Sequence, residues 1–175
     1  MERPHPSRQT TRATHGLTDE VRAVQNPALG AALLWRFACG YSPASSPLAT
    51  PLPLMFVVLP MLYHAQTATQ IASTRTGSGL RKLEEKFWGS SDILLLLQPR
   101  AVAMRDLTLH SLRIAMRSGL LTLVPSEATL WPRLEVAPPV TYGGIPTLLK
   151  SAEKLGTWCS QMTLYEVSGV LKLEL

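Results

Sequence analysis

The chain has 175 residues, of which 46% are hydrophobic and 17% are charged. This apolar fraction is large enough for the core of one domain, and the low charge predicts apolar surface that a partner covers. The formal net charge of +5 suits contact with nucleic acid or with an acidic protein surface, but it is too small to demand either.

The N-terminal part separates into a tail and the start of a domain. Residues 1–17 are polar and predict a disordered tail, and residues 18–175 predict a single domain. The first helix is predicted over residues 26–40, because Asn26 is a good N-cap residue and is followed by proline at the first helical position.

A long apolar run, Leu52 to Tyr63, follows a linker rich in proline, serine and alanine. A membrane-spanning helix needs roughly 20 apolar residues, so this shorter run predicts a buried helix over residues 52–66, strained at Pro60. His64 is placed at its C-terminal end, where it would hydrogen-bond free carbonyls or, alternatively, contact a partner. The following segment is polar, and a short charged amphipathic stretch comes after it.

Residues 92–137 predict a winged-helix-like unit, that is, two helices joined by a turn and followed by a β-hairpin. The first helix is predicted over residues 93–104, with a kink at proline, although its run of leucines also suits a strand. The second is predicted over residues 108–118, with Thr108 as its N-cap. Two apolar runs around a Pro-Ser-Glu turn predict the hairpin over residues 120–136.

The C-terminal part predicts one more helix and one strand. Apolar residues at helical spacing indicate a helix over residues 145–162. The last residues, VLKLEL, alternate apolar and polar side chains and predict a half-buried strand within residues 163–175. The predicted fold is therefore α+β, mainly helical, with a winged-helix-like unit and a C-terminal strand.

The chemistry-bearing residues are sparse and scattered. Cys39 and Cys159 stand apart, which favours small buried side chains in a reducing compartment and hence a cytoplasmic protein. Residues 1–25 are charged and carry no hydrophobic segment of the signal-peptide type. Paired carboxylates, a Ser/His/Asp set, a phosphate-binding loop and a cluster of metal-ligating histidines are all missing from the sequence pattern. We therefore expect no catalytic residues, no cofactor and no metal, although a small enzyme with an unrecognised site stays an alternative.

The second helix of the winged-helix-like unit carries a basic edge. In a DNA-binding winged helix this helix enters the major groove, and its exposed candidates are Arg105, His110, Arg113 and Arg117. The rest of the helix is mostly Leu, Ile, Ala and Met rather than residues that read base edges, which favours a solvated or protein-facing edge. If DNA is touched, we expect phosphate contacts from Arg105, Arg113 and Arg117.

Five segments resemble, in order, the middle-component family of bacterial three-component ABC systems, the accessory subunits of Lamassu-type anti-phage defence. They are NPALGAALLWRFACGY, PLPLMFVVLPMLYHAQT, ASTRT at residues 72–76, LHSLRIAMRSGLLTL and EKLGTWCSQM. The second segment is the most distinctive, with its Leu-Pro-x-x-x-His followed by threonine. The resemblance extends from about residue 18 to the end of the sequence.

The resemblance implies a non-catalytic subunit that couples an SMC/Rad50-like ABC ATPase to an effector such as a nuclease. It implies partner contacts at His64, Thr67 and Arg75, and it allows non-specific DNA contact through the assembled complex. No membrane is implied. The alternative is a winged-helix DNA-binding regulator that acts alone, which would bind duplex DNA by itself with a steep salt dependence.

Overall fold

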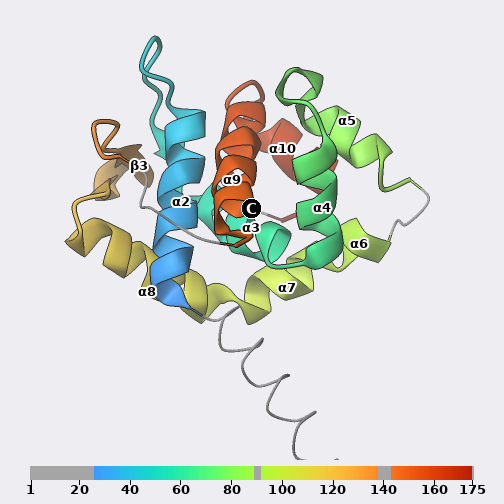
Figure 1. The fold of residues 1–175 in the computed structure, drawn as a ribbon, viewed down its shortest axis with the longest axis horizontal. Helices are drawn as coiled ribbons and strands as arrows, with labels where there is room; N and C mark the ends of the chain where they lie inside the picture. The colour runs from blue at the N-terminus through green and yellow to red at the C-terminus, as the bar shows by residue number, and fades with distance from the viewer. Residues whose placement is uncertain (1–25, 89–91, 138–142, 175) are drawn as a thin grey trace, which may run out of the picture.

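The computed structural model describes residues 26–88, 92–137 and 143–174 (Figure 1). This part of the chain is mainly helical and adds a small three-stranded antiparallel sheet, so the predicted α+β class is confirmed. The tail predicted over residues 1–17 lies outside the described residues. The division into tail and single domain stays a prediction.

Helix α2 (Pro27–Tyr41) is the central helix of the fold, and α9 (Ile145–Cys159) and α8 (Arg105–Arg117) pack against it (Figure 1). The side chain of Asn26 accepts hydrogen bonds from the backbone N–H groups of Ala28 and Leu29, as an N-cap residue does. The N-terminal boundary of this helix therefore agrees with the prediction. Most of α2 is buried, which explains its nearly uninterrupted apolar sequence.

The apolar run forms α3 (Leu52–Leu62), which lies in contact with α2, α4, α7, α8 and α9. The predicted helix over residues 52–66 is too long, because α3 ends at Leu62 and α4 (Ala65–Ser73) begins three residues later. Pro60 lies inside α3, two residues from its C-terminal end, and has no backbone N–H to donate. The chain leaves the axis of α3 after Leu62, two residues beyond this proline, and then enters α4.

The described residues between 76 and 103 form several short helices. The sequence predicted a polar stretch, a short charged amphipathic stretch and one kinked helix in this region. After α4 come the 3₁₀ turn η1 (Thr76–Ser78), α5 (Gly79–Glu85), α6 (Asp92–Leu95) and α7 (Leu97–Ala103). The helix predicted over residues 93–104 breaks at Leu96 and not at Pro99. Pro99 is the third residue of α7, where an N–H has no partner within the helix, so proline costs nothing there.

Helix α8 begins at Arg105, three residues before the predicted start. Thr108 is therefore not its N-cap: it is fully buried inside the helix, and its hydroxyl finds no hydrogen-bond partner there. The predicted hairpin is confirmed as β2 (Leu121–Val124) and β3 (Thr129–Pro132), joined by the 3₁₀ turn η2 (Pro125–Glu127).

A third strand, β1 (Thr50–Pro51), pairs antiparallel with β3 and gives the sheet order β1-β3-β2. The sequence did not predict this strand, because its two residues lie in a proline-rich linker. The winged-helix interpretation of residues 92–137 stays a prediction, although a helix followed directly by a hairpin is present.

The predicted C-terminal strand is wrong, because residues 164–171 form helix α10 (Leu164–Leu171). The Thr163 hydroxyl accepts from the backbone N–H of Glu166, and the Glu166 carboxylate accepts from the backbone N–H of Thr163. This capping box starts helix α10 before the alternating residues begin. The last turn of α10 then includes Val170 and Leu171, the first two residues of the alternating segment. Lys172 ends the helix in the left-handed conformation.

Candidate functional site

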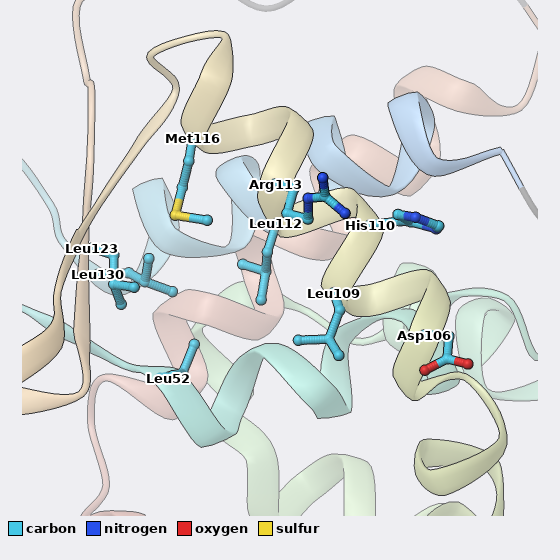
Figure 2. A pocket seen from close by; sticks show the side chains of 9 residues that line it. All are labelled: Leu52, Asp106, Leu109, His110, Leu112, Arg113, Met116, Leu123 and Leu130. Atoms are coloured by element: carbon cyan, nitrogen blue, oxygen red, sulfur yellow. The ribbon is translucent and has the colours of Figure 1, made fainter.

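An apolar groove of about 490 Å³ lies between α8, the hairpin and the first residue of α3. Figure 2 shows leucine and methionine side chains from these three elements directed into the same space. Its lining consists of six apolar residues and three polar ones: Leu52, Leu109, Leu112, Met116, Leu123 and Leu130, with Asp106, His110 and Arg113.

The spacing of apolar residues on α8 builds one wall of this groove. Leu109, Leu112 and Met116 are separated by three and four residues, so they share one face of the helix. Leu112 is buried in the core, whereas Leu109 remains 37% exposed. On the opposite wall, Leu123 and Leu130 face each other across the antiparallel hairpin. The groove is thus an extension of the core that no described residue covers.

Two charged side chains, Asp106 and Arg113, border the groove on the side of α8. Asp106 lies in the first turn of α8, and Arg113 lies two turns further along the same helix. Arg117 is exposed in the last turn, and the guanidinium of Arg133 lies close to Gly119, just beyond the helix end. The ion pairs found among the described residues involve none of these three arginines. The groove lining therefore carries one carboxylate and one guanidinium, and Arg117 and Arg133 lie beyond it.

All three arginines that the sequence singled out for phosphate contacts are exposed on α8, but the structure does not gather them into one cluster. Arg113 borders the apolar groove. Arg105 instead lines a separate hollow together with Val102 and residues of the C-terminus. The exposed face between Arg105 and Arg113 carries Leu109, so this edge of the helix is both apolar and basic.

His64 is the N-cap of α4, which corrects its predicted place at a helix C-terminus. Its Nδ1 accepts the backbone N–H of Thr67 at 3.4 Å and lies 2.8 Å from the Thr67 hydroxyl oxygen. Burial, with a smaller effect from the nearby Arg100 guanidinium, lowers the pKa of His64. Thr67 is fully buried, so it positions the imidazole and offers no surface of its own.

Arg75 is exposed in the turn between α4 and η1, at the opposite end of α4 from His64. Two side chains of α9 hold this turn. The Lys154 ammonium donates to the carbonyls of Ile71, Ala72 and Thr74 at 2.7–3.0 Å, and Trp158 Nε1 donates to the Thr76 carbonyl at 2.6 Å. The backbone that carries Arg75 is therefore fixed on both sides.

Sequence reasoning missed a second positioning residue, Arg100. Its guanidinium donates to the carbonyls of Ile93, Leu96 and Pro60, and so joins the ends of α6 and α3. Arg100 and His64 together border a hollow of about 510 Å³. A lone arginine in a leucine-rich stretch gives no sequence signal for this role, because its acceptors are backbone atoms of distant residues.

Within the described ranges, no group of three or more His, Cys, Asp and Glu side chains is placed to hold a metal ion. In the same part of the chain, each helix is too short or too polar to cross a membrane. Burial raises the pKa of Cys159 to about 12 and that of the half-buried Cys39 to about 11, so neither thiol is activated as a nucleophile.

The described residues form a mainly helical α+β fold, and its apolar groove, bordered by charged side chains, is suited to contact with another molecule. In a comparison with protein families, the family described as ABC-three component (ABC-3C) system Middle Component 3 matches residues 14–175. The chain belongs to this family, and it is thus a middle component of a system with other components. Comparisons with curated proteins and with solved structures give no match.

Proposed function

We propose that this chain is a non-catalytic accessory subunit that couples an SMC/Rad50-like ABC ATPase to an effector, such as a nuclease, in anti-phage defence. The observation that carries the proposal is the family membership over residues 14–175, since a middle component implies further components on either side. The apolar groove and the scarcity of chemistry-bearing side chains support a role in contact rather than in catalysis.

The two ends of α4 are the proposed contact surface for one of these partners. His64 at the N-terminal end keeps a partly exposed imidazole, and Thr67 fixes its orientation. Arg75 at the other end projects from a turn that Lys154 and Trp158 hold in place. Because the supporting backbone is already ordered, a partner would bind these groups at a low entropic cost.

Co-expression of the chain with the ATPase and the effector tests the proposal. We expect the wild-type chain to co-purify with at least one of them and the complete set to protect cells in a plaque assay. Arg75→Ala should weaken co-purification and abolish protection, while thermal unfolding of the isolated chain stays unchanged. Arg81→Ala is the matched control, because Arg81 is also exposed and makes only a surface ion pair with Glu166 at 3.6 Å. A wild-type chain that associates with neither protein would refute the proposal.

Direct DNA contact through the assembled complex is the alternative use of this edge of α8, and Arg105, Arg113 and Arg117 would then contact phosphates. All three side chains are exposed on α8, which supports this assignment. Replacing all three with glutamine should weaken DNA binding of the complex equally on all sequences. The rival function, a regulator that acts alone, requires instead that the isolated chain bind duplex DNA with a steep salt dependence in a gel-shift titration.

A further inference from the structure

We propose that the groove between α8 and the hairpin receives an apolar segment of a partner subunit that carries acidic residues at the end facing Arg113. This inference rests on the proposed function, because it assigns the groove to a component of the same system. It adds the location of the contact and the chemistry of the bound segment.

The apolar walls determine the first property of the occupant. Leu109, Met116 and Leu123 border open space, although Met116 and Leu123 also pack against core residues. Covering this surface would remove apolar area from water at about 25 cal/mol per Å². A phosphate backbone has no apolar groups with which to fill such a groove, so we assign the occupant to a protein segment.

The charged side chains along α8 determine the second property of the occupant. Arg113, Arg117 and Arg133 gather near the C-terminal end of α8, and they take no part in the ion pairs seen among the described residues. Asp106 stands at the other end, about 10 Å away at 1.5 Å of helix rise per residue. A bound segment with carboxylates next to these arginines and a basic or neutral side chain next to Asp106 is complementary to this distribution of charge. The same segment bound in the reverse orientation would place like charges together.

A segment from another subunit fits this polarity better than a second copy of the chain. The chain has 17 Lys and Arg residues against 12 Asp and Glu, so its own surface is on average basic. Two basic surfaces repel each other, whereas an acidic segment of a different protein is attracted. Self-association through the groove is therefore an outcome that the experiment must be able to reveal.

Titration of the purified chain against the purified ATPase and effector provides the first test. We expect Leu109→Asp to raise the Kd at least about tenfold, because it introduces a charge into the apolar contact. Arg113→Glu should raise the Kd and Arg113→Lys should largely preserve it. Gln161→Asp is the matched control: Gln161 is exposed after the end of α9, outside the groove lining, and its replacement should leave the Kd unchanged.

Photo-crosslinking identifies the occupant. With p-benzoylphenylalanine in place of His110, we expect the complex to yield one captured peptide of the ATPase or the effector, with apolar side chains and at least one Asp or Glu. Capture of a second copy of the chain, capture of DNA, or a captured peptide without acidic residues would each overturn the inference. If the wild-type chain binds its partners and Leu109→Asp binds equally well, only the groove assignment fails. If the wild-type chain binds neither partner, the proposed function itself fails.

Discussion

At the scale of single residues, the fold depends on cations that are used as hydrogen-bond donors to backbone carbonyls. Lys154 donates to three carbonyls at the C-terminal end of α4, and its ammonium lies 5.9 Å from the centre of the Trp158 ring. The last carbonyls of a helix lack partners within the helix, and a positive charge there also interacts favourably with the helix dipole. Burial, together with the nearby Lys86, lowers the pKa of Lys154. One side chain thus joins α9 to α4 and to the turn of Arg75.

Replacing Lys154 with methionine should lower the free energy of unfolding by about 1–3 kcal/mol, because hydrogen bonds from a charged donor are lost while the apolar stem is kept. Lys150→Met is the control, since Lys150 lies on the same helix but is exposed. Chemical denaturation of both variants measures the difference. Equal stability of the two variants would show that the Lys154 contacts contribute nothing to folding.

His64 links stability to pH, because its Nδ1 must be unprotonated to accept the N–H of Thr67. The folded state lowers the pKa of His64, so the unfolded chain binds more protons than the folded one as the pH falls below about 6.5. The contribution of this cap to stability is therefore present at neutral pH and is lost as the pH falls from about 6.5 through the lowered pKa of the folded state.

The variant His64→Asn keeps an N-cap side chain and removes the titrating group. We expect its stability relative to wild type to increase by up to about 1 kcal/mol between pH 7 and pH 5, as the wild-type cap becomes protonated. Urea denaturation at several pH values measures this change. A difference between the two proteins that stays constant over this range would contradict the assigned role of Nδ1.

At the scale of elements, glycines set the distance between the central helices. A Cβ added at Gly156 of α9 would stand 2.0 Å from the carbonyl oxygen of Phe37 in α2, and one at Gly40 of α2 would stand 1.9 Å from the carbonyl oxygen of Glu153. The two helices therefore touch backbone to backbone at this crossing. Arg36 and Glu153 form an ion pair beside it.

Gly156→Ala should destabilise the protein by about 1–3 kcal/mol or more, because the obstacle is backbone rather than a side chain that can rotate away. The matched control is Gly169→Ala in α10, where nothing lies within 4 Å of an added Cβ. There the substitution should stabilise by about 0.5–1 kcal/mol, because alanine is the better helix former. Thermal unfolding should shift in opposite directions for the two variants. A Gly156→Ala variant that is as stable as the wild type would contradict the backbone contact between α2 and α9.

The elements also show what local sequence can predict. The start of α2 was predicted correctly from Asn26, and the hairpin was predicted correctly from its turn residues. Both signals act within a few residues of the chain. The VLKLEL alternation was misleading, since the capping box of Thr163 and Glu166 initiates a helix that extends into it. The segment of His64 was misplaced because one apolar run continues to the end of α3 and gives no sign of the second helix.

The candidate site was harder to predict than the fold. The sequence placed Arg113 on the correct helix and indicated an apolar face, but the groove needs Leu52 and Leu130 as well. These residues are far apart in the chain, and only β1 pairing with β3 brings them to the same place. Long-range pairing of so short a strand leaves no periodic pattern in the sequence.

At the scale of the whole molecule, large apolar side chains are exposed on several separate elements. The most exposed are Tyr165 (87%), Trp88 (76%) and Val102 (65%), and Leu95 and Leu96 are more than half exposed on α6 and the turn that follows. Together with the apolar groove, they place exposed apolar surface on several elements of the described part of the chain. Single exposed apolar residues are ordinary, whereas several such areas are typical of a subunit that is covered in its assembly.

The last prediction is that the chain is an obligate subunit. Expressed alone, it should aggregate through its exposed apolar side chains outside the groove, because no partner is present to cover them. Co-expressed with the ATPase and the effector, it should be recovered in one species of defined mass and in higher yield, because binding to the folded state stabilises it. Size-exclusion chromatography with light scattering compares the two preparations, and an unrelated ABC ATPase serves as the co-expression control. A chain that is monodisperse and monomeric alone, with a yield that its partners do not change, would contradict the prediction.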